Sequence, residues 1–315
     1  MSAMSEAMYS QPAALRRVLE DTTGLAGAAD KVRGRRVFLS GTGTSLHAAE
    51  QGARLLQMAG VDARAVPAAD AVTNGPHPQA SDALVLLTHR GTKRHTTELL
   101  RRAHGDGVPT VVISKVGSAV SDLDTTQEEK SSAFTSSHLC ALMRLAQLAA
   151  ELGADLGALD RVPEAVADEL KAGRSGVLPP ARLLEFVGSG INAWTAAEGA
   201  LKTRETSYIA CAGGNAEQFL HGPSVALGPS DTLVILDGGG PEQMRLEEIG
   251  GVVGAQGATV HHIRRRELGE ALSIFPLTTF VQKVALEAAE TRGTNPDSFG
   301  KDLQGRAEAW SRIEL

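Results

Sequence analysis

Short apolar runs, each followed by a turn of glycine and hydroxyl residues, recur along the chain. One run at 37–39 stops at Ser-Gly-Thr-Gly-Thr-Ser, 40–45, and an apolar pattern with helical spacing resumes over 46–58. Another run at 83–87 leads into Thr-His-Arg-Gly-Thr, 88–92. A run too short for a helix, then a turn, then helical spacing predicts a buried strand, a tight turn and a helix.

Elements of the same kinds complete the first half of the chain. Apolar spacing predicts a strand over 108–114 and helices over 11–20, around 96–103 and over 134–152. The stretch 154–180 combines glycines and a proline pair with a short helix near 163–171, which is typical of a linker.

The same pattern begins again after the linker. A run at 183–187 leads into Gly-Ser-Gly at 188–190, a helix is expected from Asn192, and strands are expected at 232–236 and 258–263. Strand, glycine turn and helix in both halves predict an α/β protein with two tandem doubly wound parallel-sheet domains, related by internal duplication. The predicted division is an N-terminal helical segment 1–30, a first domain 31–153, a linker 154–180, and a second domain with a C-terminal tail 181–315.

Composition narrows the class of protein. The 315 residues are 42% hydrophobic, which is enough to form the cores of two domains. The formal net charge of −6 argues against nucleic-acid binding through a general basic field. Only Cys140 and Cys211 occur, so we expect no disulfide framework, no metal and a reducing cytoplasmic location. No stretch approaches the roughly 18 apolar residues of a membrane span, and we expect no membrane partner.

The turns after the first two apolar runs carry candidate ligands for an anion. In open parallel sheets, ligands bind beyond the carboxyl ends of the strands, where helix N-termini offer backbone N–H groups. Neither turn matches a dinucleotide or triphosphate motif, which favours a simple phosphate site. The alternative is that the hydroxyls cap helices and the glycines only make the turns. The candidate side chains are Thr44, Ser45, Thr88, Arg90, Thr92 and Lys93.

A charged helix and a histidine are the candidates for acid/base chemistry. Glu198, Lys202 and Glu205 fall within an arc of about 60° on one helix face. An exposed ion pair with a second glutamate beside it would have the same spacing. We expect Ala-Cys-Ala-Gly-Gly, 210–214, to carry the chain away from this helix in a glycine turn. His221, followed by Gly-Pro, then stands at a loop end, where it serves either a ligand or the structure.

The stretch E-G-A-L-K-x-x-E-x-S-Y-I at 198–209, followed by H-G-P, resembles the sugar isomerase (SIS) family. The resemblance is greatest to the isomerase half of glucosamine-6-phosphate synthase and to single-chain amino-sugar-phosphate deaminases and isomerases. The turn at 40–45, Ala-Phe-Thr at 133–135 and Arg-Gly-Thr-Asn-Pro-Asp at 292–297 are similar to further motifs of that family.

The resemblance implies two flavodoxin-like, three-layer αβα SIS domains, a homodimer with shared active sites, a sugar-phosphate ligand and no cofactor. Glu205 would shuttle a proton between C1 and C2 of the sugar. His221, reaching into the site of the partner subunit, would open the sugar ring. Glu198 and Lys202 would orient sugar hydroxyls and tune Glu205. The phosphate would be held by Thr44, Ser45, Thr88, Arg90 and Thr92, with Ser131 and Ser132 nearby.

The sequence departs from the family pattern at three places. The family's phosphate loop reads Ser-x-Ser-x-x-Thr, whereas 88–93 reads Thr-His-Arg-Gly-Thr-Lys. Arg90 and Lys93 would then grip the phosphate through charge-assisted bonds, or the ligand differs in shape. The synthase's Schiff-base lysine falls at Gln304 or Gly305, and Lys301 is the one lysine of the tail, which places Schiff-base chemistry in doubt. No glutaminase domain is present, so we expect no glutamine-dependent amination by this chain alone.

Three functions remain open on these residues. The first is an enzyme that interconverts the aldose and ketose forms of a hexose or hexosamine 6-phosphate, with or without loss of ammonia. The second is a non-catalytic regulator that binds a sugar phosphate, and the third is a fructosamine-phosphate deglycase. A regulator needs phosphate turns but no acid/base pair, so Glu205 together with His221 favours an enzyme.

Overall fold

The computed structural model describes residues 1–313, so residues 314 and 315 of the predicted second domain lie outside the described residues. The chain divides into two compact units. The amino-terminal unit contains residues 10–129, 136–160 and those from 309 onward, and the carboxy-terminal unit contains 1–9, 130–135 and 161–308. The domain boundaries expected at 30, 153 and 180 stay predictions.

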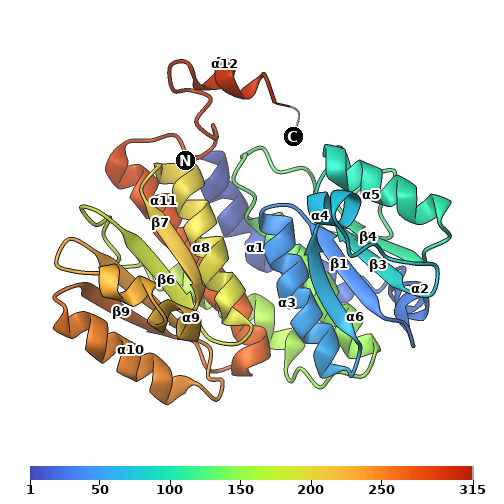
Figure 1. The fold of residues 1–315 in the computed structure, drawn as a ribbon, viewed down its shortest axis with the longest axis horizontal. Coiled ribbons are helices and arrows are strands. Elements are labelled where there is room, and N and C mark those ends of the chain that lie inside the picture. Colours follow the sequence, from blue (N-terminus) through green and yellow to red (C-terminus); the bar gives the residue numbers. More distant parts are fainter. Residues whose placement is uncertain (314–315) are drawn as a thin grey trace. The chain divides into compact units, whose positions relative to one another are not determined.

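A five-stranded parallel sheet of order β2-β1-β3-β4-β5 forms the centre of the amino-terminal unit (Figure 1). Its strands are β1 (Val37–Gly41), β2 (Ala63–Pro67), β3 (Ala83–Leu87), β4 (Thr110–Ser114) and β5 (Leu123–Asp124). The helices of this part of the chain are α1 (Ala3–Glu20), α2 (Leu25–Val32), α3 (Thr44–Met58), α4 (Ala68–Thr73), α5 (Arg94–Gly105) and α6 (Ser136–Glu151).

Helices cover both faces of this sheet. Leu39 of β1 faces α3 and α6, since a Cβ on Gly52 of α3 would meet Leu145 of α6 at 2.8 Å and Leu39 at 2.9 Å. The neighbouring Phe38 belongs to the cluster on the opposite face, which includes Leu99 of α5. Central strands buried on both faces read as continuous apolar runs, which explains why these runs predicted the strands.

A four-stranded parallel sheet of order β7-β6-β8-β9 forms the centre of the carboxy-terminal unit. Its strands are β6 (Leu184–Gly188), β7 (Cys211–Asn215), β8 (Thr232–Asp237) and β9 (Thr259–Arg264). Its helices are α7 (Val162–Lys171), α8 (Asn192–Ser207), α9 (Ala216–Leu220), α10 (Gln243–Ala255), α11 (Gly269–Arg292) and α12 (Arg306–Trp310). Across residues 1–313, none of the helices has both the length and the apolar character needed to cross a membrane.

The second sheet repeats the strand order of the first. The order β7-β6-β8-β9 corresponds to β2-β1-β3-β4, with β6 in the place of β1 and β8 in the place of β3. Helices α8 and α11 pack on one face, and α9 and α10 on the other (Figure 1). The predicted fold class of two doubly wound parallel-sheet domains in tandem is confirmed.

The expectation of a glycine turn at 210–214 is wrong. Cys211–Asn215 pairs with β6 and forms the edge strand β7. A Cβ on Gly213 would lie 2.3 Å from the backbone oxygen of Ala196 on α8. Glycine therefore lets α8 pack directly on the edge strand, which is a close approach rather than a turn.

Helix α7, inside the predicted linker, is joined to α11 by a buried ion cluster. Glu169 Oε1 lies 2.9 Å from Lys283 Nζ, and its Oε2 lies 2.6 Å from Arg265 Nε. Glu169 is 3% exposed and Lys283 is 7% exposed, so both charges depend on these partners. The second part of the linker is thus a fixed layer of the carboxy-terminal unit.

Glu185, in the middle of β6, should lower stability at neutral pH. Burial raises the pKa of this carboxyl from 4.5 to about 7, and its side chain is 7% exposed. A folded-state pKa above the unfolded value stabilises the fold at low pH, and this contribution is lost as pH rises from about 4.5 to about 7.

We expect Glu185→Gln to remove this pH dependence. Urea unfolding between pH 4.5 and 8 should show the variant gaining up to about 3 kcal/mol relative to wild type as pH rises. Glu242→Gln, at an exposed glutamate, should follow the wild-type curve. Parallel curves for Glu185→Gln and wild type would refute the buried, neutral carboxyl.

Candidate active site

Lys202 of α8 holds two carboxylates from its own helix. Its Nζ lies 2.6 Å from Glu205 Oε2 and 3.6 Å from Glu198 Oε1. The side chains of Glu198 and Lys202 are 0% and 1% exposed, whereas that of Glu205 is 16% exposed. The shared helix face predicted from the spacing is confirmed, and its alternative as an exposed ion pair is wrong.

The end of α8 is anchored to α11 by threonine hydroxyls. Thr206 Oγ1 donates to the backbone oxygens of Lys202 and Ala285, at 2.9 and 3.0 Å. Thr294 Oγ1 donates to the backbone oxygen of Thr206 at 2.7 Å. Tyr208, with φ of 58°, ends the helix in the left-handed region. The backbone that carries Glu205 is therefore fixed on both sides of that residue.

The motif at 292–297 continues this anchoring to the start of α1. The carboxylate of Asp297 accepts hydrogen bonds from the backbone N–H groups of Ala3 and Met4, both at 2.8 Å. Those are the first helical N–H groups of α1, which lack partners within the helix, so Asp297 caps it. The backbone oxygen of Asp297 also accepts from the N–H of Ser132 at 3.3 Å.

The neighbouring Ser131 is buried at 1% exposure, and its hydroxyl accepts from Ala133 N at 3.1 Å. Both predicted serines, Ser131 and Ser132, thus belong to the carboxy-terminal unit. Their place near a bound phosphate stays a prediction.

Within the α8 cluster, Glu205 is the side chain suited to act on a ligand. Glu198 and Lys202 are sealed from solvent, so their charges can act only through neighbours, while Glu205 retains access. The hydrogen bond from Lys202 Nζ, at 2.6 Å, fixes the position of the Glu205 carboxylate. A fixed carboxylate with solvent access is an arrangement suited to proton transfer.

His221 lies at the end of α9, outside this cluster's contacts. Its side chain is 69% exposed, and its Nε2 lies 3.1 Å from Glu217 Oε1. Glu217 is also bound by Arg245, with Nε 2.8 Å from Oε2. The exposed imidazole agrees with the loop-end position expected from the sequence, and its role in the site of a partner subunit stays a prediction.

The turns predicted to bind phosphate follow adjacent strands of the amino-terminal unit. Thr44 and Ser45 open α3 directly after β1, and Thr88 follows β3, which pairs with β1. A Cβ on Gly41 would lie 2.7 Å from Ser45 Cβ, so only glycine allows this turn to close so tightly. Thr88 Oγ1 accepts from the N–H of Gly91 at 3.1 Å, which shapes the second turn. The structure therefore places both turns at one edge of the sheet.

Cations at this edge already have an acidic partner that the sequence reasoning missed. Arg90 Nε lies 2.8 Å from Glu128 Oε1, and Lys115 Nζ lies 3.1 Å from Glu128 Oε2. The hydrogen bond from Lys115 and the charge of Arg90 lower the pKa of Glu128. An incoming phosphate would have to compete with this carboxylate. The sequence feature that could have indicated this partner is the acidic pair Glu128 and Glu129, directly before Lys130. Thr92 and Lys93 are exposed on the same loop.

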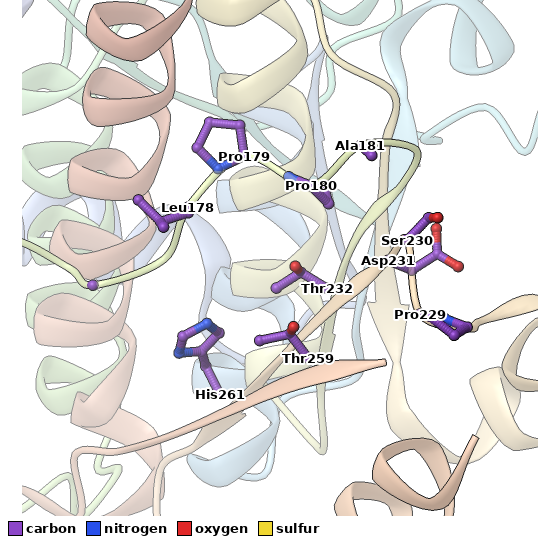
Figure 2. A pocket seen from close by; sticks show the side chains of 11 residues that line it. Leu178, Pro179, Pro180, Ala181, Pro229, Ser230, Asp231, Thr232, Thr259 and His261 are labelled. Atoms are coloured by element: carbon purple, nitrogen blue, oxygen red, sulfur yellow. The ribbon is translucent and has the colours of Figure 1, made fainter. Parts of the chain in front are cut away.

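An open depression of about 370 Å³ lies at the edge of the second sheet where the amino ends of its strands meet. Thr232 and Thr259, the first residues of β8 and β9, line it together with His261 and the Leu178–Pro180 segment (Figure 2). Asp231 at its rim is bound by Arg182 and by the N–H groups of Gly228 and Leu183. This depression faces the amino ends of the strands, whereas α/β sheets bind ligands at the carboxyl ends.

Comparisons with known proteins give the class of the fold. Residues 32–151 match the family model of the SIS domain. The recognition made from the motifs is confirmed.

Particular relatives extend the likeness over most of the chain. Glutamine–fructose-6-phosphate aminotransferase (isomerizing) of Pyrococcus horikoshii is 28% identical over 302 residues, covering 83% of this chain and 50% of that protein. The chain thus spans about half the length of the curated relatives it matches.

Two solved structures share the fold. The C-terminal domain of glucosamine-fructose-6-phosphate aminotransferase from Francisella tularensis has a TM-score of 0.78 at 18% identity, covering 94% of this chain and 98% of that chain. Glucosamine-6-phosphate deaminase from Thermotoga maritima has a TM-score of 0.77 at 19% identity, covering 94% and 97%.

Removing the cation at the centre of the α8 cluster should destabilise the fold. We expect Lys202→Met to cost about 3–5 kcal/mol, because it removes the buried cation that compensates the carboxylates of Glu198 and Glu205. Chemical denaturation at pH 7 measures this cost. Arg204→Met, an exposed cation on the same helix, should change stability by less than about 0.5 kcal/mol. Equal effects of the two substitutions would show that the cluster carries no special stability.

Proposed function

We propose that this protein is an enzyme that converts the aldose form of a hexose or hexosamine 6-phosphate to the ketose form, with release of ammonia when the sugar carries an amino group. The observation that carries the proposal is the α8 cluster, in which a fully buried Lys202 fixes the partly exposed carboxylate of Glu205. The likeness to glutamine–fructose-6-phosphate aminotransferase and to glucosamine-6-phosphate deaminase supports this class of substrate.

In the proposed reaction, Glu205 moves one proton between two carbons. The carboxylate takes the proton from C2 of the open-chain aldose while the C1 oxygen gains a proton, which gives an enediol. Glu205 then returns the proton to C1, and the C2 hydroxyl loses its proton to form the ketone. With an amino group at C2, the same transfer gives an imine at C2, and water converts the imine to the ketose and ammonia.

The other predicted residues divide the remaining tasks. His221, from a second copy of the chain, would open the sugar ring, which requires a homodimer with shared sites. Glu198 and Lys202 would set the position and charge of Glu205. The phosphate would bind at the carboxyl edge of the first sheet, through Thr44, Ser45, Thr88, Arg90, Thr92 and Lys93. Glutamine-dependent amination is not part of the proposal.

Glu205→Gln should separate catalysis from binding. We expect turnover of hexose and hexosamine 6-phosphates to fall by about 10²–10⁴-fold, because the amide cannot accept the proton. Binding of the same sugars, measured by calorimetry, should change by less than a few-fold. A panel of hexose, hexosamine and N-acetylhexosamine phosphates, assayed for both ketose and ammonia, gives the substrate and the reaction together.

Glu242→Gln, at an exposed glutamate, is the control and should keep full turnover. Sugar-phosphate binding without turnover in the wild type would instead identify a regulator. Turnover only of a fructosamine phosphate would identify a deglycase. Full activity in Glu205→Gln would end the assignment of Glu205 as the base.

Glu128→Gln should strengthen phosphate binding. The substitution removes the carboxylate that competes with the ligand for Arg90, and an exposed ion pair of this kind is worth up to about 1 kcal/mol, or about fivefold in Kd. Arg90→Gln should weaken binding by a similar factor, and Glu151→Gln, an exposed glutamate of α6, should leave Kd unchanged. Calorimetric titration with a hexose 6-phosphate measures all three. Unchanged Kd in both Glu128→Gln and Arg90→Gln would remove this loop from the phosphate site.

A further inference from the structure

The depression at the amino ends of the second sheet's strands is separate from the proposed active site. Its lining residues lie within 176–181, 229–232 and 259–261, all in the carboxy-terminal unit, so none belongs to the α8 cluster or to the predicted phosphate turns. At about 370 Å³ it falls within the range of about 300–1,000 Å³ in which proteins bind small molecules. Thr232, Thr259 and His261 lie on one side of it, and the Leu178–Pro180 segment lies on the other (Figure 2).

The hydroxyl of Thr232 lines this depression without a partner of its own. Thr232 is 5% exposed, and its backbone N–H donates to the oxygen of Leu183 at 3.0 Å, but its hydroxyl makes no hydrogen bond within residues 1–313. Thr110, the first residue of β4 and 7% exposed, instead donates its hydroxyl to the oxygen of Val108 at 3.0 Å. Because buried hydroxyls in native proteins normally find a partner, that of Thr232 is suited to bind a ligand in the depression.

His261 presents an imidazole to the same depression. It stands two residues after Thr259 on the edge strand β9, so both side chains lie on one face of the sheet. The ring makes no hydrogen bond or ion pair with any other residue that the structure describes. Burial lowers the pKa of His261 from 6.5, so the ring is mostly neutral at pH 7 and offers one donor and one acceptor.

The carboxylate in this lining is paired within the chain. Asp231 is 2% exposed, and its carboxylate is bound by Arg182 and by the N–H groups of Gly228 and Leu183. Burial would raise the pKa of Asp231, but the hydrogen bonds from Arg182 and Gly228 outweigh it and lower that pKa. A charged ligand would lose its hydration here without gaining an ion pair in return, so the depression favours an uncharged one.

The wall opposite the strands is apolar. It consists of Leu178, Pro179 and Pro180, and Leu178 is 73% exposed. The face of an aromatic ring carries partial negative charge, and it therefore packs well against C–H groups such as those of proline rings. Proline-rich segments bind aromatic surfaces in this way in peptide recognition. The wall thus suits a ligand with an aromatic ring.

We propose that this depression is a second binding site, for an uncharged small molecule that combines an aromatic ring with an amide or hydroxyl group. The ring lies against the Leu178–Pro180 segment, and the polar group forms hydrogen bonds with the Thr232 hydroxyl and the His261 imidazole. The inference goes beyond the proposed function and does not depend on it, since no residue of the α8 cluster or of the phosphate turns takes part.

The experiment compares nicotinamide, an uncharged aromatic amide, with nicotinate, which has the same ring and a carboxylate. Binding of each to the full chain at pH 7 is followed through the NMR signals of the histidine rings and through saturation transfer to the ligand. We expect nicotinamide to bind with a Kd on the order of 1 mM, as suits a ligand of its size. Nicotinate should bind at least about tenfold more weakly, because its charge gains no ion pair in the depression.

Three variants locate the binding. Thr232→Val removes the hydroxyl and keeps the shape of the side chain, so the Kd for nicotinamide should rise about fivefold while the midpoint of thermal unfolding does not fall. His261→Ala should raise the Kd by a similar factor. Thr110→Val is the matched control, because it removes the hydrogen bond to the oxygen of Val108. It should lower the unfolding midpoint and leave the Kd unchanged.

Several results would overturn the proposal. They are the absence of saturable nicotinamide binding, equal binding of nicotinamide and nicotinate, and an unchanged Kd in both Thr232→Val and His261→Ala. A fall in the unfolding midpoint of Thr232→Val as large as that of Thr110→Val would show that the Thr232 hydroxyl serves the fold, and this result too would overturn the proposal.

Discussion

The buried cation of Lys202 is the constraint on which the carboxy-terminal unit depends. A charge that is 1% exposed must be compensated in place, and its two carboxylates stand on the same helix within 2.6 and 3.6 Å. That compensation holds only while α8 is sealed against its neighbours. Several contacts hold α8 in this position, namely the hydrogen bonds of the Thr206 and Thr294 hydroxyls and the close packing of Gly213 on the helix. The proposed base, Glu205, is thus held by the core rather than by a loop.

The two sheets share a strand order but differ in what fills their carboxyl edges. In the first sheet, a hydroxyl-bearing turn leads into α3. Beside it, Arg90 forms an ion pair with Glu128. In the second sheet, the Glu270 side chain lies against Gly190 and Gly240. Duplication of a fold repeats the helix starts that attract anions, because these follow from backbone geometry.

The elements that could be predicted are those in which the residue pattern along the chain reflects burial. Strands β1, β3, β4, β6 and β8 are buried along their whole lengths, so apolar residues dominate each of them, although β6 also carries the buried Glu185. The edge strands β2 and β7 lack such a run, since one side of each is open. The glycines of β7 moreover resemble those of a turn, and the contact with α8 explains Gly213. Helix α11 carries apolar residues all round because it is buried, which removes the spacing that reveals a surface helix.

The sequence by itself determined the α/β alternation, the repeated turns and the placement of Glu198, Lys202 and Glu205 on one helix face. These follow from local periodicity, which the chain carries wherever it folds. Only the tertiary structure decided that this face is buried, that Arg90 is paired with Glu128, and that the Glu270 side chain lies against Gly190 and Gly240. Each of these depends on segments far apart in the chain, such as Arg90 and Glu128, which are 38 positions apart. Burial and charge pairing are set by which distant elements pack together, and spacing along the chain does not record that.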